Sequence, residues 1–432
     1  MKICMFTNTY LPHIGGVARS VAVFADDLRH RGHEVLVVAP TFPGLHRGDE
    51  DPDRVVRVPA LQKFNGSDFS VRLLLPGQFR RRLDAFAPEI IHSHHPFLLG
   101  DAALRTARHR RLPILFTHHT LYERYTHYVP FDSPVMQRFV IELATRFANL
   151  CRRVIAPSES IARLLEKRGV TTPCRVVPTG VDTDLFRQGR GRRFRDKLNI
   201  PPEAFVLGHL GRLAPEKNLA FLTEAAIKAC RTLKNGVFLV AGVGSSRDRI
   251  KKDFAGAGLG ERLVMVGELQ GNDLPDCYAA MDLFLFASTS ETQGIVLTEA
   301  MAAGLPVIAL DAPGAREVVR DRSNGRLLAQ TAMPDDFAAA IIDAAADHEE
   351  LARWHEEGLR TAKLFSRQVS VRRLEEVYRE ALLPQPKGSG ATLDAWEAIL
   401  ESLQAEWDLV TSKFGAVFEA VGHPADVPAE LD

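Results

Sequence analysis

The sequence predicts an α/β protein made of two Rossmann-like domains in tandem. Three observations indicate this fold class: short apolar runs alternate with segments of helical period, the alternation stops at a break at about 178–204, and it then restarts. Such alternation is typical of parallel, doubly wound sheets with helical crossovers on both faces. The 432 residues suit two or three domains of ordinary size.

The first domain is expected to span residues 1–180. The apolar run 2–7 predicts a buried strand, 17–31 has the spacing of an amphipathic helix, and 35–39 predicts the next strand. With helices between them, further strands are expected at 89–93, 113–117 and 153–156.

A linker is expected at 181–204, because prolines and glycines there flank the basic run 187–195. The second domain follows at 205–365 and repeats the alternation. Its strands are expected at 205–210, 236–241, 262–266, 282–286 and 306–310.

Helical spacing continues toward the C-terminus. Residues 333–383 predict helices, with 366–384 as a C-terminal helix, and Pro384 and Pro386 then mark a break. Residues 385–432 predict an amphipathic helical tail with an acidic outer face. Such a tail packs on its own domain or forms a homodimer contact, and its acidity argues against binding an anionic membrane.

Composition excludes several classes of protein. The 54 Lys and Arg residues equal the 54 Asp and Glu residues, so the chain lacks the global positive field that would attract nucleic acid. Its five cysteines are scattered, without a C-x-x-C pair, which argues against a disulfide framework or a zinc site. We expect a cytoplasmic protein, because neither a signal-peptide core nor a membrane-spanning apolar run is present.

Glycines form the first candidate site. The strand 2–7 runs into a turn with Gly15 and Gly16, and a helix follows. Glycines let a ligand approach the backbone closely, and a helix N-terminus favours an anion. Taken alone, the pattern also fits an ordinary tight strand-to-helix turn.

Charged residues form two further candidate sites. Arg212 and Lys217 follow the strand 205–210, at the sheet edge where ligands of such folds bind, and two cations suit a pyrophosphate. Glu291 and Glu299 flank a helix start at Gly294. The free N–H groups of that helix can hold a phosphate or a sugar hydroxyl, and Glu299 can accept both hydroxyls of a ribose.

In this order, the motifs resemble those of the family 4 glycosyltransferases, a large retaining nucleotide-sugar family with the GT-B fold. The resemblance runs from Met1 to about Leu383 and implies two Rossmann-like domains facing a cleft, plus a C-terminal helical appendage. It rests on Gly15-Gly16-Val17, Thr117-His118-His119-Thr120, Pro178-Thr179-Gly180-Val181-Asp182, Gly211-Arg212 with Glu216-Lys217-Asn218, and the E-x7-E pair Glu291 and Glu299.

The resemblance implies a role for each site residue. Arg212 and Lys217 match the pair that holds the donor pyrophosphate, and Glu299 matches the carboxylate that holds the nucleoside ribose. Glu291 matches the acid beside the transferred sugar. The loop amides that hold the sugar hydroxyls are matched by Gln293, Gly294 and Ile295. Gly16 matches the glycine that lets the N-terminal loop approach phosphate, and His119 matches the histidine that faces the sugar. His118 is the neighbour most easily confused with His119, since alternation along a strand points the two in opposite directions.

Two positions depart from the common family pattern. Thr179 stands where the family usually has Asn, and Gln293 stands where many members have Phe. Both departures bear on linker and sugar contacts.

No metal or other cofactor is expected. In a GT-B enzyme, basic side chains and helix dipoles neutralise the leaving diphosphate. The D-x-D strings 51–53 and 182–184 fit ordinary turn chemistry. His92, His94 and His95 lack an acidic or cysteine partner at useful spacing.

The acceptor is the least determined substrate. Residues 117–130 and 291–294 are similar to bacterial transferases that place glucose on diacylglycerol, which favours UDP-glucose as donor and a membrane lipid as acceptor. Two arginine clusters could bind an anionic membrane surface. The first is Arg72, Arg80, Arg81 and Arg82, and the second is Arg105, Arg108, Arg110 and Arg111. Such binding would make the protein peripheral on the inner face of the plasma membrane. Solvated helix faces explain the same clusters equally well.

Three alternatives stay open. The first is a glycosyltransferase with a soluble acceptor or a glycan intermediate. The second is an epimerase or phosphorylase on the same fold, and the third is a non-catalytic nucleotide-sugar binding protein.

Overall fold

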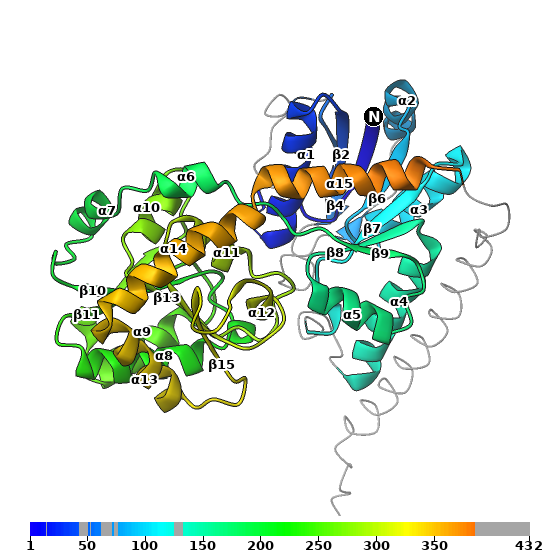
Figure 1. Ribbon diagram of the computed structural model, residues 1–432. Coiled ribbons are helices and arrows are strands. Elements are labelled where there is room, and N and C mark those ends of the chain that lie inside the picture. The colour runs from blue at the N-terminus through cyan, green and yellow to red at the C-terminus, as the bar shows by residue number, and fades with distance from the viewer. Residues whose placement is uncertain are drawn as a thin grey trace, which may run out of the picture.

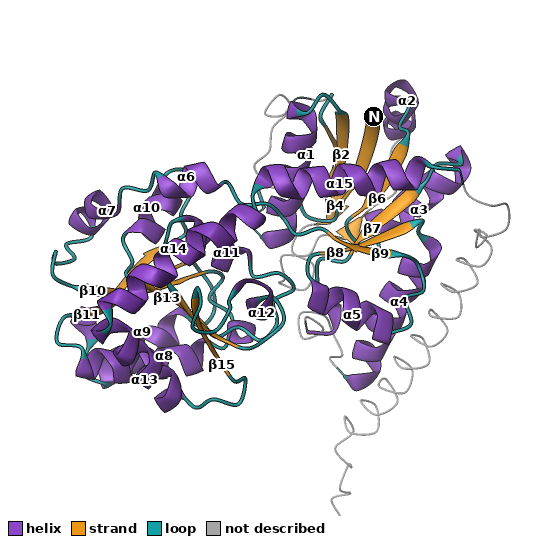
Figure 2. Ribbon diagram, viewed as in Figure 1, coloured by secondary structure: helices purple, strands orange, loops and turns teal. Residues whose placement is uncertain are grey.

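The computed structural model describes residues 1–13, 15–42, 51, 53–61, 71–72, 77–124 and 133–384. Two parallel sheets, each with helices on both faces, lie side by side (Figure 2). We call the parts that hold them the N-terminal half and the C-terminal half. The predicted fold of two Rossmann-like domains is confirmed. The predicted tail, 385–432, lies outside the described residues.

The N-terminal half has a seven-stranded sheet in the order β3-β2-β1-β6-β7-β8-β9. Its strands are β1 (Lys2–Phe6), β2 (Glu34–Pro40), β3 (Val55–Val58), β6 (Ile90–Ser93), β7 (Ile114–Thr117), β8 (Arg153–Ala156) and β9 (Cys174–Val176). The helices are α1 (Gly16–His30), α2 (Gly77–Phe86), α3 (Leu99–Arg110), α4 (Pro134–Leu150) and α5 (Glu159–Lys167), with the 3-10 turn Tyr122–Arg124. A separate antiparallel pair joins β4 (Ala60–Leu61) and β5 (Val71–Arg72).

The C-terminal half has a six-stranded sheet in the order β12-β11-β10-β13-β14-β15. Its strands are β10 (Phe205–Leu210), β11 (Gly236–Ala241), β12 (Leu263–Gly267), β13 (Leu283–Phe286), β14 (Val307–Leu310) and β15 (Gly325–Leu328). Its helices include α8 (Leu219–Thr232), α9 (Arg247–Gly256), α10 (Asp273–Ala279), α11 (Ile295–Ala302), α12 (Ala315–Val318), α13 (Pro334–Ala346) and α14 (His348–Leu364), with 3-10 turns Pro215–Lys217 and Gly260–Arg262.

Strand order reverses at the same place in both sheets. In the first sheet β1 lies between β2 and β6, and in the second β10 lies between β11 and β13. Ligands of open α/β sheets bind at the carboxyl ends of strands beside such a reversal. The Gly15-Gly16 turn follows β1 and Arg212 follows β10, so both predicted motifs stand at these points.

The final described helix, α15 (Arg367–Leu382), returns to the N-terminal half and lies across it (Figure 1). Its buried face packs against β1, β2 and α1 in one apolar cluster, whose members include Ile3, Met5, Val21, Phe24, Val371, Leu374 and Tyr378. Thus the core of the N-terminal half is completed by the far end of the chain.

The segment predicted as a linker is folded onto the C-terminal half. It forms α6 (Thr183–Arg187) and α7 (Gly191–Lys197), whose Phe186 and Phe194 are buried in the core of that half. A Cβ atom added at Gly191 would lie 2.0 Å from the carbonyl oxygen of Ala279, so glycine permits this close packing. The prolines and glycines predicted a break, but the apolar residues between them anchor the segment.

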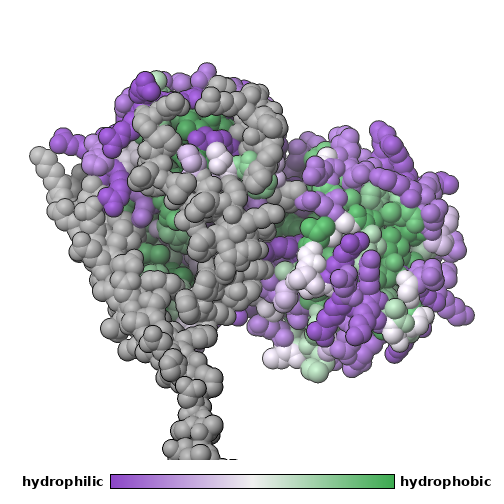
Figure 3. Space-filling model, turned by 180° about the vertical axis from the view of Figure 1, so that it is seen from behind, coloured by the Kyte–Doolittle hydropathy of each residue, from purple (hydrophilic) through white to green (hydrophobic). Residues whose placement is uncertain are grey.

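In the described part of the chain, no helix is both long and apolar enough to cross a bilayer. From behind, hydrophobic residues on the C-terminal half are bordered by hydrophilic ones (Figure 3). The five cysteines are unpaired and four of them are buried.

Candidate active site between the two halves

The site begins at the carboxyl end of β1. Gly15 caps α1 in an extended conformation, with φ −179°, and Gly16 opens the helix. A Cβ atom added at Gly16 would meet no described heavy atom within 4 Å. No described atom thus fills the position beside Gly16, and the N-terminus of a helix such as α1 favours an anion.

The two basic residues of the C-terminal half each have an acidic partner. Arg212 Nη2 lies 2.6 Å from Glu216 Oε1, and Lys217 forms an ion pair with Glu291. Both cations lie on the segment that follows β10. Their charges are thus held at the sheet edge before any ligand binds.

A tightly packed loop presents Glu291 to Lys217. Gly294 caps α11 with φ 72°, a left-handed conformation that favours glycine. Gly314 lies against the same loop, and a Cβ atom added there would come within 2.9 Å of the Cβ of Glu291. The loop leads directly into the N-terminal amides of α11, at Gln293, Gly294 and Ile295, which are hydrogen-bond donors for an oxygen-rich ligand.

Glu299 is fully buried in α11. Its Oε2 accepts a hydrogen bond from the Tyr278 hydroxyl at 2.8 Å, and its Oε1 forms an ion pair with Arg19 of α1. Burial raises the pKa of Glu299, while Arg19 and the Tyr278 hydroxyl act in the opposite direction. The carboxylate predicted to hold ribose therefore also links the two halves.

His119 and His118 point in different directions. His119 lies with its Nε2 2.9 Å from Nδ1 of His94, and its backbone carbonyl accepts a hydrogen bond from the Thr292 hydroxyl of the C-terminal half at 2.8 Å. His118 is buried, with its ring 5.5 Å from that of Tyr122. Of the two, His119 is the histidine whose backbone contacts the loop that carries Glu291.

Burial makes this histidine cluster neutral. It lowers the pKa of His92, His95, His118 and His119 to about 3 in each case, and that of His94 well below its ordinary value. His92 is fixed by hydrogen bonds of 2.7 Å to the hydroxyls of Tyr378 and Thr117. The cluster is thus a set of neutral hydrogen-bonding groups around physiological pH.

The side chain of Gln293 contacts the backbone of Thr179. Its amide oxygen and nitrogen bond the backbone N–H and carbonyl of Thr179, at 2.7 and 2.8 Å. The Thr179 hydroxyl lies 2.7 Å from that of Ser20 in α1. The two residues that depart from the family pattern therefore contact one another across the halves.

One described aspartate of each D-x-D string makes a turn or cap contact. Asp182 accepts a hydrogen bond from the N–H of Leu185 at 3.0 Å and so caps α6, and Asp51 accepts one from Asp53 at 2.9 Å. Among the described residues, no group of three or more His, Cys, Asp and Glu side chains is placed to hold a metal ion.

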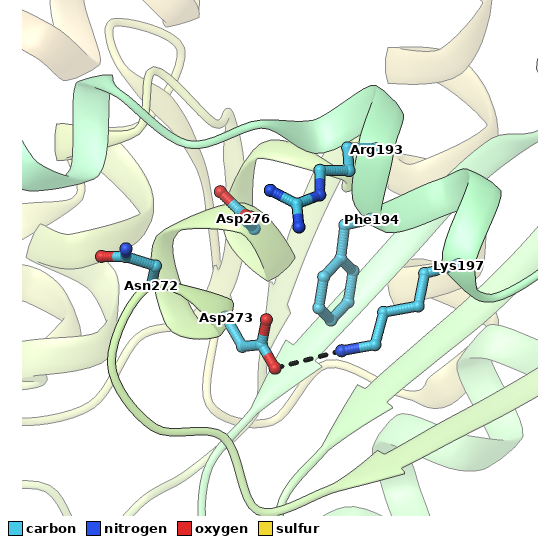
Figure 4. Close-up of a pocket in the computed structure, with 6 residues that line it drawn as sticks. All are labelled: Arg193, Phe194, Lys197, Asn272, Asp273 and Asp276. Atoms are coloured by element: carbon cyan, nitrogen blue, oxygen red, sulfur yellow. Dashed lines mark hydrogen bonds and ion pairs between the residues drawn. The ribbon is translucent and has the colours of Figure 1, made fainter.

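A surface pocket lies apart from this site, between α7 and α10. Figure 4 shows Lys197 pairing with Asp273 there, at 3.2 Å, with Arg193 and Asp276 opposite one another. None of the predicted site residues lines it. It belongs to the packing of the 181–204 segment on the C-terminal half.

Sequence reasoning missed Arg19 and Tyr278. Arg19 completes the first turn of α1, which has no acidic residue in that turn. Because the helix dipole disfavours a cation at this end, a basic residue there indicates an anionic partner, and this signal could have identified it. Tyr278 gives no comparable local signal.

Two family models match the chain. The model described as Glycosyltransferase Family 4 matches residues 14–185, and the model described as Glycosyl transferases group 1 matches residues 191–361. Together they cover both halves in chain order.

Similar proteins extend over most of the chain. It is 30% identical to the alpha-monoglucosyldiacylglycerol synthase of Streptococcus pneumoniae, over 80% of this chain and 78% of that protein. It is 31% identical to the GDP-mannose-dependent alpha-mannosyltransferase of Mycobacterium tuberculosis, over 76% and 84% of the two chains. HepE of Anabaena, solved in complex with UDP, superposes with a TM-score of 0.71 at 22% identity, covering 88% of this chain and all of that one.

Proposed function

The chain belongs to glycosyltransferase family 4 and has the GT-B fold, and from this premise we propose that it moves a hexose from a nucleotide diphosphate sugar to a membrane lipid. The donor is UDP-glucose, the acceptor is a lipid hydroxyl such as that of diacylglycerol, and the product has an α-linkage. The observation that carries this proposal is the similarity to the alpha-monoglucosyldiacylglycerol synthase of S. pneumoniae.

In the proposed reaction, Arg212 and Lys217 bind the diphosphate and neutralise the charge that develops on it as the sugar leaves. Glu299 binds the ribose, and Glu291 with the N-terminal amides of α11 binds the hexose. The acceptor hydroxyl attacks on the face that the diphosphate leaves, and a diphosphate oxygen takes its proton. No enzyme nucleophile is required, and retention follows from attack on the same face.

His119 faces the sugar in this proposal as a neutral hydrogen-bonding group. The half-buried ring of His119 has a pKa lowered to about 3, which supports this role over that of an acid or base near pH 7. His94 fixes the orientation of the ring through its 2.9 Å contact.

A basic surface supports a lipid acceptor. Arg110 of α3 pairs with Asp84 of α2, so α2 with Arg80, Arg81 and Arg82 contacts α3, which carries the second arginine cluster. Arg80, Arg81, Arg105 and Arg111 are exposed. Each basic residue near an anionic leaflet adds about 1 kcal/mol to binding, which would keep the protein peripheral at the inner face of the plasma membrane.

The test is a donor and acceptor panel. Purified protein is incubated with UDP-glucose, UDP-galactose or GDP-mannose, with and without diacylglycerol in mixed micelles, and released nucleotide and glycolipid are measured. We expect UDP and an α-glucolipid only when diacylglycerol is present. Turnover of GDP-mannose alone, or equal transfer to a soluble acceptor without lipid, would contradict the proposed donor or acceptor.

Membrane binding is tested with liposomes that contain phosphatidylglycerol. The double variant Arg80→Glu, Arg81→Glu is expected to sediment with them at least tenfold less than the unmodified protein, because two attractive charges become repulsive. Lys251→Glu, Lys252→Glu, on exposed α9 of the C-terminal half, is the matched control. Equal loss in both double variants would contradict a specific basic face.

A soluble acceptor is the second candidate. Similarity to a mannosyltransferase at 31% identity is the observation that favours a different donor and acceptor on the same fold. The same panel distinguishes the two functions, since a soluble acceptor is used without detergent or lipid.

A further inference from the structure

Arg19 is the cation that the N-terminal half places in the site. It stands one turn after Gly15, and its backbone N–H donates to the Gly15 carbonyl at 3.0 Å. Its side chain is 41% exposed, while the Glu299 carboxylate with which it pairs is 1% exposed. The guanidinium therefore reaches from a solvent-accessible edge of α1 to a buried group in α11.

The contact with Glu299 is incomplete as a hydrogen bond. Among the described residues, Oε1 of Glu299 accepts no hydrogen bond, although Arg19 is at ion-pair distance. A buried carboxylate oxygen is stabilised when a donor hydrogen points at it. A ribose hydroxyl would supply that hydrogen, and Arg19 is positioned where the ribose must arrive.

The ion pair between Arg19 and Glu299 has a counterpart in the site, a second ion pair of a cation with a glutamate. Lys217 pairs with Glu291, and the proposed function gives both glutamates to the donor's sugars and Lys217 to its diphosphate. In each pair, a sugar hydroxyl can replace the cation at the carboxylate. The released cation then meets the diphosphate, which restores charge balance.

We propose that Arg19 is a third donor-binding cation, which pairs with Glu299 while the donor is absent and with the donor diphosphate once ribose hydroxyls occupy Glu299. The inference rests on the proposed nucleotide-sugar donor. Guanidinium is suited to this exchange, because its planar fork binds carboxylate and phosphate in the same way. Since Arg19 belongs to the N-terminal half, the donor then binds both halves.

The experiment compares a nucleoside diphosphate with its nucleoside. Affinities of UDP, GDP and ADP are measured by isothermal titration, and the matching nucleosides by displacement. We expect Arg19→Gln to weaken the preferred diphosphate about 10-fold to 100-fold, as for the loss of a hydrogen bond between charged groups. The nucleoside, which contacts Glu299 but carries no phosphate, should change less than threefold.

The controls separate this role from a structural one. Arg249→Gln, on the exposed face of α9, should leave both affinities unchanged, and melting temperatures report folding. Equal weakening of diphosphate and nucleoside would mean that Arg19 only holds Glu299, and it would overturn the inference. So would unchanged diphosphate binding.

A second variant covers the case in which Arg19→Gln does not fold. Arg19→Lys keeps the charge but loses the planar fork, so diphosphate affinity should fall severalfold while the nucleoside is unaffected. An unmodified protein that binds none of the three diphosphates would overturn the proposed donor, and this inference with it. Binding by the unmodified protein that neither Arg19 variant alters would overturn the inference alone.

Discussion

The side-chain amide of Gln293 forms a two-point contact with the backbone of Thr179. The Thr179 N–H donates to Gln293 Oε1 at 2.7 Å, and Gln293 Nε2 donates to the Thr179 carbonyl at 2.8 Å. Both residues are 4% exposed. The contact joins the loop that carries Glu291 to the end of the N-terminal half.

Replacing Gln293 with Leu should destabilise the protein. The change leaves a buried N–H and a buried carbonyl without partners, at about 1–3 kcal/mol for each group. We expect a clearly lower urea midpoint, measured by fluorescence. Gln270→Leu, at an exposed position, is the control, and an unchanged midpoint for Gln293→Leu would show that the contact contributes no stability.

Arg212→Ala and Lys217→Ala should each slow turnover by about 100-fold or more, the usual effect of removing one group that stabilises developing negative charge. Release of nucleoside diphosphate is the measurement, with exposed Lys234→Ala as control. Near-normal turnover in both variants would remove them from the active site.

The contacts of Glu375 predict that the folding stability of the protein depends on pH. Hydrogen bonds from Arg31, at 2.6 and 2.9 Å, are the main cause of a Glu375 pKa of about 2, and His33 adds to them. A carboxyl whose pKa is lowered in the folded state stabilises the protein at pH values above its ordinary pKa, which is near 4.5. This stability is lost as the pH falls toward 2.

Glu375→Gln should therefore lower the melting temperature at pH 7 by an amount equivalent to about 1–3 kcal/mol. The gap to the unmodified protein should close as the pH falls from 5 toward 2. Calorimetry across that range checks it, with the exposed neighbour Glu376→Gln as control. A gap that is constant with pH would be inconsistent with the ionised contact.

His119 should remain neutral from pH 8 to pH 5, because burial lowers its pKa to about 3. Its Cε1 resonance in an NMR titration should therefore not move over this range, and the His119→Gln spectrum assigns the resonance. A midpoint near the ordinary value of 6.5 would contradict a desolvated ring. In that case His119 could serve in acid–base chemistry.

Local sequence patterns predicted most strands because a buried parallel strand is a short apolar run. The expected strand 205–210 coincides with β10, and 236–241 with β11. The edge strands β3, β9 and β15 were not predicted, and neither was the short antiparallel pair of β4 and β5. Cys174–Val176 has only three residues, and the chain from Gly325 to Leu328 begins with a glycine and an arginine, so neither forms a distinct apolar run.

Contacts between distant residues could not be predicted in the same way. Arg212, Lys217, Glu291 and Glu299 lie in motif strings, which identify them. Arg212 pairs with Glu216, and Lys217 with Glu291, inside the C-terminal half, whereas the ion pair of Glu299 depends on how the halves meet. The Arg19–Glu299 pair joins α1 to α11, and no periodicity in either segment refers to the other. Residues 366–384 were expected to be helical, because helical spacing is local. Their packing on β1 and α1 was not predicted, because it joins distant parts of the chain.

The return of α15 has a consequence for synthesis. Tyr378 and Val371 fill the cluster that contains Ile3 and Phe24, and the ribosome makes them only after the whole C-terminal half. From His30, the end of α1, to Leu382, the end of α15, synthesis at about 5–20 residues per second leaves the apolar face of β1 and α1 without its cover for about 20–70 s. The nascent first half therefore exposes this apolar face during that interval, and a fragment ending before α15 would keep the same face uncovered.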